Sequence, residues 1–135
     1  MERLNDRLSL AQRALGTLGE ALSEPKTPMN RDASIQRFEY TYEAVWKAAQ
    51  LYLSAIENVE AGSPTSVARA CFRAGLLTEE QARTVLAMAR DRNLTVHTYN
   101  EELADQIYAR LPAHTTLMDA WLDAMERAAG QGGAA

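Results

Sequence analysis

The sequence predicts an all-α protein, an antiparallel up-and-down bundle of four main helices with short helices between them. Apolar residues recur in steps of three and four along most of the chain, which is the period of an amphipathic helix. No segment shows the sustained alternation of a β-strand, and no repeat of solenoid length is present. Short connections between such helices favour antiparallel neighbours around one core.

The first helix is expected from about Leu4 to Leu22. Its apolar positions alternate in steps of four and three and are separated by charged residues, as in a helix with one face in the core. Pro25 and Pro28 follow among small polar residues. Because proline lacks the N–H that a helix interior needs, this segment is predicted to be a loop.

A second and longer helix is predicted from about Ile35 to Glu60. One of its faces carries an apolar stripe, composed of Ile35, Phe38, Tyr42, Val45, Trp46, Ala49, Leu53 and Ile56. The aromatic side chains of this stripe are expected in the core rather than on a base-stacking surface. Gly62 suits the left-handed residue that ends such a helix.

Start and stop signals predict two more helices. The third begins at Pro64, because Ser63 is a good N-cap and proline is favoured at the first helical position. Gly75 closes it. Thr78 and Gln81 form the capping box of a fourth helix, which is expected to reach about residue 92.

The C-terminal part predicts one or two further helices after the stretch 93–100. A fifth helix is predicted by the apolar residues Leu103, Ile107 and Leu111. A second apolar set predicts either a sixth helix or a continuation of the fifth past Pro112, and it consists of Leu117, Met118, Trp121, Leu122 and Met125. Residues 1–129 are thus predicted to form one domain, and residues 130–135 a flexible tail.

The bulk composition excludes several classes of protein. A chain of 135 residues buries enough surface to fold without a disulfide or a metal. The single cysteine, Cys71, and the absence of zinc-site spacing favour the cytoplasm. No apolar stretch has the length of a signal peptide or membrane span. A net charge of −4 argues against a non-specific nucleic-acid coat but leaves a local RNA site open.

The predicted second helix also carries Glu39, Glu43 and Lys47, which recur every four residues. Such spacing is typical of ordinary stabilising ion pairs on one helix face. The alternative is a metal site, but no histidine accompanies these carboxylates, so neither a metal nor another cofactor is expected. Glycine-rich phosphate loops and the carboxylate triad of a nucleotidyl-transferring enzyme are not present either.

The candidate functional residues are Arg92, Asn93, His97 and Tyr99. Cleavage of RNA needs a base for the 2′-hydroxyl and a cation for the charge that develops on the phosphate, which His97 and Arg92 can supply without a metal. Attack and leaving-group protonation each need a proton carrier, so a homodimer is expected to complete the site. A structural interpretation competes: Arg92 suits the negative end of a helix, and His97 a hydrogen bond in the turn. His114 is expected at a surface or half-buried position.

Two stretches of the sequence resemble the nucleotidyltransferase substrate-binding proteins, a branch of the HEPN superfamily that pairs with minimal nucleotidyltransferases. They are IQRFEYTYEAVWK at 35–47 and DRNLTVHTY at 91–99, with Ser63, Pro64 and the run 74–77 between them. The resemblance spans about residues 2–128. Val85 stands where many members have tryptophan, which implies altered packing beneath the site.

The resemblance implies a homodimeric bundle of four main helices. The motif of an arginine followed after four to six residues by a histidine falls on Arg92 and His97, and the family's tyrosine falls on Tyr99. In the superfamily this motif is linked to metal-independent RNA cleavage. The paired nucleotidyltransferase can act as an antitoxin that transfers AMP to the tyrosine, and it is expected in a neighbouring reading frame.

Three functional hypotheses follow. The first is an endoribonuclease toxin of a toxin–antitoxin pair, in which Arg92 and His97 are catalytic and Asn93 and Tyr99 position RNA. The second is a non-catalytic subunit that recruits a nucleotide or acceptor to a separate nucleotidyltransferase. The third is a helical interaction protein whose paired charges are only surface ion pairs.

Overall fold

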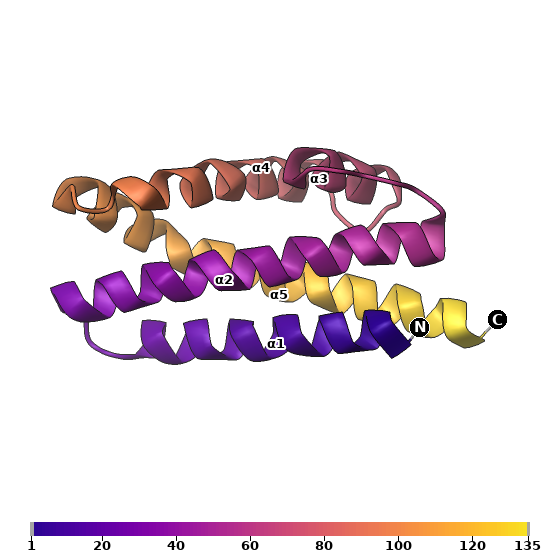
Figure 1. Ribbon diagram of the computed structural model, residues 1–135, viewed down its shortest axis with the longest axis horizontal. Coiled ribbons are helices and arrows are strands. Elements are labelled where there is room, and N and C mark those ends of the chain that lie inside the picture. The colour runs from indigo at the N-terminus through magenta and orange to yellow at the C-terminus, as the bar shows by residue number, and fades with distance from the viewer. Residues whose placement is uncertain (1, 135) are drawn as a thin grey trace.

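Five α-helices form the bundle in the computed structural model, which describes the backbone of residues 2–134 and the side chains of residues 2–130. They are α1 (Glu2–Ser23), α2 (Pro28–Tyr52), α3 (Pro64–Arg73), α4 (Glu79–Leu94) and α5 (Glu101–Ala134). Figure 1 shows α1 and α2 as an antiparallel pair, with α5 packed along them and the α3–α4 pair on the far side of α2. The predicted all-α fold is confirmed. None of the helices described in residues 2–134 is both long and apolar enough to cross a membrane.

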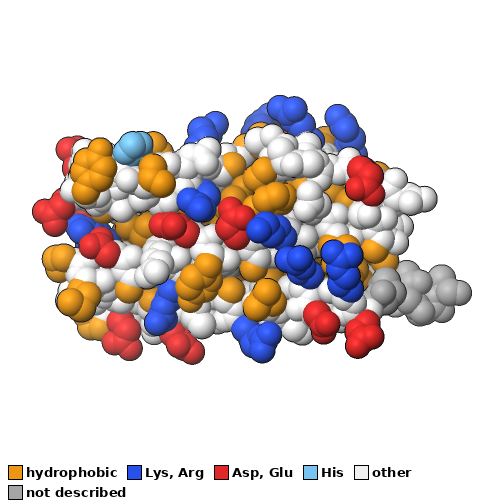
Figure 2. Space-filling model, viewed as in Figure 1, with side chains coloured by type: hydrophobic (Ala, Val, Ile, Leu, Met, Phe, Trp, Pro, Cys, Tyr) orange, Lys and Arg blue, Asp and Glu red, His pale blue; other side chains and the backbone are white. Residues whose placement is uncertain are grey.

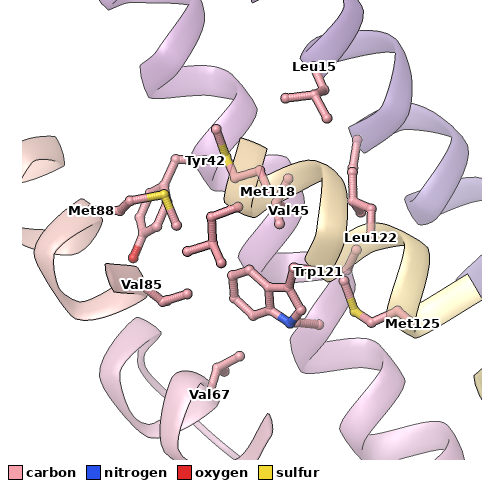
Figure 3. Packing of buried hydrophobic residues seen from close by; sticks show 14 of the residues in the cluster. Leu15, Tyr42, Val45, Val67, Val85, Met88, Met118, Trp121, Leu122 and Met125 are labelled. Atoms are coloured by element: carbon pink, nitrogen blue, oxygen red, sulfur yellow. The ribbon is translucent and has the colours of Figure 1, made fainter. Parts of the chain in front are cut away.

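The core forms where α5 meets the other helices. Figure 3 shows Trp121 of α5 between side chains of α2, α3 and α4, among them Val45, Val67 and Val85. The indole is fully buried, and a buried aromatic ring of this size contributes a large share of the hydrophobic stabilisation. Phe38 and Tyr42 are buried as well, and Trp46 is half-buried against the core, so the aromatic residues of the stripe face the core as predicted.

The boundaries of α2 differ from those predicted. The helix begins at Pro28, because the Thr27 side chain accepts a hydrogen bond from the Asn30 backbone N–H at 2.9 Å and proline occupies the first turn. The prediction that Pro28 belongs to a loop is therefore wrong. At its other end the helix continues as one π-helical turn, Leu53–Glu57, and the left-handed residue that follows is Asn58, with φ of 59°. The prediction for Gly62 is wrong, since asparagine also tolerates this conformation.

The predicted signals for α3 and α4 are confirmed. Ser63 caps α3 ahead of Pro64, and Thr78 and Gln81 form a capping box at the start of α4. Gly75 has a φ of +80° after the end of α3. These signals are local hydrogen-bonding and steric effects, so they do not depend on the rest of the fold.

The fifth and sixth predicted helices are one helix, α5. Pro112 lies inside it at an exposed position, so continuation past the proline is confirmed. The side chains of residues 131–135 lie outside the described part of the structure. The flexible tail at 130–135 and the domain boundary at residue 129 therefore stay predictions.

Candidate functional site

Arg92 lies in the last turn of α4 and faces α2. Its guanidinium is 4.0 Å from a Glu39 carboxylate oxygen and 3.7 Å from one of Glu43. One guanidinium nitrogen also donates a hydrogen bond of 3.3 Å to the Thr95 hydroxyl. The ion pair expected between Glu43 and Lys47 is present at 3.6 Å. Sequence reasoning missed that the two carboxylates of α2 face Arg92, because no local spacing signals a contact between separate helices.

A pocket of about 290 Å³ lies beside this arginine. Its lining residues come from α2, α3 and α4, and they are Tyr42, Glu43, Pro64, Thr65, Ala89, Arg92 and Asn93. Figure 3 shows Tyr42 reaching from α2 towards α4, the helix that carries Val85 and Met88. The volume is near the lower end of the range for small-molecule sites.

Two buried polar atoms of this pocket's lining residues lack a hydrogen bond, although one of them, the Arg92 Nε, is the atom 3.7 Å from the Glu43 carboxylate. The Tyr42 hydroxyl and the Arg92 Nε are both buried, and neither has a hydrogen-bond partner among the residues that the structure describes. Burial, with a smaller effect from Glu43, raises the pKa of Tyr42 to about 12 although Arg92 acts in the opposite direction. Tyr42 is therefore a neutral donor at physiological pH. A buried donor without a hydrogen bond costs free energy, so the Tyr42 hydroxyl is a candidate contact for a ligand.

His97 and Tyr99 lie on the turn that follows α4. Both are exposed, and the Tyr99 hydroxyl is 3.4 Å from the Nδ1 of His97, with the rings edge to face. The 3₁₀ turn Thr95–His97 carries the histidine into this position. The four predicted site residues are thus divided: Arg92 and Asn93 line the pocket, whereas His97 and Tyr99 are not among its lining residues.

A polar cluster centred on the buried Asp91 lies next to Arg92 in the sequence. Asp91 accepts two hydrogen bonds from the Arg110 guanidinium, at 2.7 and 2.8 Å, and is 2.8 Å from the Nε2 of His114. The expectation of a surface or half-buried His114 is wrong: its ring is buried and stacks on Phe38. The cluster joins the end of α4 to α5 and so fixes the helix turn that presents Arg92.

Burial acts to raise the pKa of the Asp91 carboxyl, but hydrogen bonds from His114 and Arg110 more than offset it and lower the pKa to about 2. Asp91 is therefore ionised at neutral pH and acts as an anchor. In the part of the chain that the structure describes, no group of three or more His, Cys, Asp or Glu side chains is placed to hold a metal ion.

Comparison with known proteins decides the family. A family model described as nucleotidyltransferase substrate binding protein like matches residues 6–127. The chain belongs to this family. The matched residues extend from α1 to α5, so membership applies to the whole bundle and includes the Arg92 pocket.

Solved structures similar to this chain include one from Thermus thermophilus and one from Haemophilus influenzae. A Thermus thermophilus protein is 51% identical, with a TM-score of 0.83, over 85% of this chain and 98% of that one. A Haemophilus influenzae protein, described as revealing the fold of a substrate binding domain of a nucleotidyltransferase, is 21% identical with a TM-score of 0.75. That likeness covers 88% of this chain and 98% of the other, and shows the shared fold. No curated protein matches the chain.

Proposed function

We propose that this protein is the substrate-binding subunit of a two-component nucleotidyltransferase, in which a separate minimal enzyme carries the catalytic carboxylates. Family membership supports this, as does the description of the Haemophilus influenzae structure as a substrate binding domain of a nucleotidyltransferase. The partner enzyme is expected in a neighbouring reading frame, and the cytoplasm is the proposed location of the pair.

The observation that carries the proposal is the Arg92 pocket, which combines the Arg92 guanidinium with a Tyr42 hydroxyl that has no partner among the described residues. A bound nucleotide or acceptor offers phosphate and hydroxyl oxygens that Arg92 and Tyr42 can bind as donors. Asn93 adds an amide at the edge. The contacts of Arg92 with Glu39 and Glu43, at 4.0 and 3.7 Å, are longer than hydrogen bonds, so the guanidinium can form shorter ones with an anionic ligand.

Co-expression with the neighbouring nucleotidyltransferase tests the proposal. A stable complex is expected, and titration of that complex with ATP should show binding that Arg92→Gln weakens about tenfold, the loss of one charge-assisted contact. Arg90→Gln is the matched control, because Arg90 is an exposed neighbour on α4 that does not line the pocket. Failure of the two proteins to co-purify, or equal effects of both substitutions, contradicts the proposal.

A second candidate function is that of a metal-independent endoribonuclease toxin, and the exposed His97 beside Tyr99 favours it. In this mechanism His97 acts as base or acid, Arg92 holds the scissile phosphate, and a homodimer supplies the second histidine. Purified protein should then degrade RNA, and His97→Ala should abolish the activity. RNA that remains intact with both proteins rejects this candidate and leaves the substrate-binding function standing.

Tyr99 is the proposed AMP acceptor of the toxin–antitoxin alternative. Tyr99 is 83% exposed, so a partner enzyme can reach the phenol oxygen. That oxygen attacks the α-phosphorus of ATP, pyrophosphate leaves, and the phenol proton passes to solvent. Incubation with the partner enzyme and ATP should add the mass of AMP to the intact protein but not to Tyr99→Phe, and an unchanged intact mass rules the modification out.

A further inference from the structure

A second hollow lies on the same side of α2 as the Glu43 carboxylate that lines the Arg92 pocket. It has a volume of about 380 Å³ and lies between the first turns of α1 and the last turns of α2. We call it the basic groove, and its lining residues are Arg3, Arg7, Lys47, Gln50, Leu51, Ser54 and Glu60.

The charge of the basic groove is opposite to that of the protein. Three of its lining residues are cations and one, Glu60, is a carboxylate that accepts a hydrogen bond from Ser54 at 2.9 Å. Arg3 and Arg7 lie one turn apart on α1, and neither has an ion-pair partner among the described residues. Like charges at this spacing repel. In a chain of net charge −4, such a hollow attracts anions locally.

The basic groove adjoins the Arg92 pocket. Glu43 lines the pocket and Lys47 lines the groove, and their side chains are joined by the 3.6 Å ion pair. Figure 2 shows acidic and basic side chains along the middle of this face, with basic ones gathered towards the end where the N-terminus lies. One extended ligand can therefore contact both hollows.

We propose that the basic groove binds phosphates of a nucleotide ligand whose end occupies the Arg92 pocket. Arg3 and Arg7, the two cations of the groove without an ion-pair partner among the described residues, neutralise the phosphates. The half-buried Leu51 offers apolar contact to a ribose or base. A single-stranded nucleic acid carries a phosphate at every nucleotide and can contact both hollows, whereas the phosphates of a nucleoside triphosphate all lie at one end of the molecule. We therefore favour the single strand as the ligand. The inference rests on the proposed function and names the substrate class of that function.

Fluorescence anisotropy with a labelled single-stranded RNA of about ten nucleotides tests the proposal on the full-length protein. Arg3→Gln with Arg7→Gln should weaken binding about tenfold. Each phosphate contact to a single strand adds about 0.7 to the slope of log affinity against log salt, so the slope should fall in magnitude by about 1.4. Arg69→Gln with Arg73→Gln is the matched control, because these arginines of α3 have the same spacing, are exposed and do not line either hollow.

The outcomes separate cleanly. Loss of RNA binding confined to the Arg3 and Arg7 variant supports the proposal. If the natural protein binds ATP but not RNA, and the variant loses ATP binding, the single-stranded nucleic acid is overturned as the ligand. Equal loss in both double variants, or loss in neither, overturns the proposal. Co-purification with the nucleotidyltransferase should persist in the Arg3 and Arg7 variant, so failure of the groove and failure of the proposed function are told apart.

Discussion

Single residues set the chemistry of the Arg92 pocket. Tyr42 is a buried residue of the hydrophobic core, yet its hydroxyl ends without a partner among the described residues. Its ring therefore stabilises the fold while its hydroxyl costs free energy, because a buried unsatisfied donor loses its hydrogen bond to water. Such a conflict is expected where a side chain serves a ligand.

The substitution Tyr42→Phe separates these two contributions. The free energy of unfolding should stay the same or rise by up to about 1 kcal/mol, because the unsatisfied hydroxyl is removed and the ring remains. Affinity of the nucleotidyltransferase complex for ATP should fall several-fold. Tyr40→Phe is the control, since that exposed hydroxyl is paired with Thr17: it should cost stability slightly and leave ATP binding unchanged. Urea unfolding and calorimetric titration measure both, and a destabilised Tyr42→Phe with normal affinity would contradict the assignment.

Asp91 gives the fold a pH dependence. Its pKa is about 2 in the folded protein against an ordinary value of 3.8, so its contribution is fully present above about pH 5 and is lost as pH falls towards 2. The lost share is about 2 kcal/mol. Asp91→Asn should destabilise the protein by about 3 kcal/mol at pH 7, because Arg110 and His114 lose a buried anion.

Urea unfolding curves at pH 7, 4 and 3 check this prediction. The difference in unfolding free energy between the natural protein and Asp91→Asn should shrink as pH falls, since protonation removes the same charge. A difference that stays constant over this range would show that the carboxylate is not the stabilising form.

At the scale of helices, α3 and α2 are ended by different kinds of left-handed residue, a glycine and an asparagine. Gly75 follows α3 with a φ of +80°, whereas α2 and its π-helical turn end at the left-handed Asn58 and leave Gly62 without a positive φ. A methyl group added at either glycine meets no atom within 4 Å. The effect of alanine at these positions therefore reports backbone conformation alone.

Alanine substitutions at the two glycines should have opposite effects. Gly75→Ala should lower the free energy of unfolding by about 1 to 2 kcal/mol, the cost of a left-handed conformation for a residue with a Cβ. Gly62→Ala should be neutral or stabilise by up to about 1 kcal/mol, because it restricts the unfolded chain. Thermal or urea unfolding of both variants is sufficient, and equal losses would place Gly62 in a left-handed turn after all.

For the whole molecule, the predictable features are those with local causes. Helix periods, the Ser63 and Thr78 caps and the closing Gly75 depend on neighbours within one turn, and the structure confirms them. The contacts of Arg92 and the burial of His114 depend on which helices pack together, and a single sequence does not encode this locally. Sequence reasoning could therefore propose candidate site residues but could not divide them between the pocket and the surface.

The proposed homodimer is a property of the whole molecule that an exposed patch can test. Val96 is 68% exposed and lies between the half-exposed Leu94 and the exposed Tyr99 on the turn after α4, and neighbouring apolar side chains of this kind often mark an interface. If two copies meet there to bring their His97 residues together, Val96→Asp buries a charge in the dimer and should yield monomers. Phe72→Asp is the control, since this 45% exposed residue lies on α3.

Light scattering on a sizing column over a range of concentrations measures the mass of each variant. Both substitutions replace an exposed apolar residue by a carboxylate, so the helical content seen by circular dichroism should not change. A monomeric Val96→Asp beside a dimeric Phe72→Asp places the interface at the turn that carries His97. In contrast, a dimer that persists with Val96→Asp does not form at this turn and holds its two His97 side chains apart. The ribonuclease mechanism then lacks its second proton carrier, whether or not the Arg92 pocket binds a ligand.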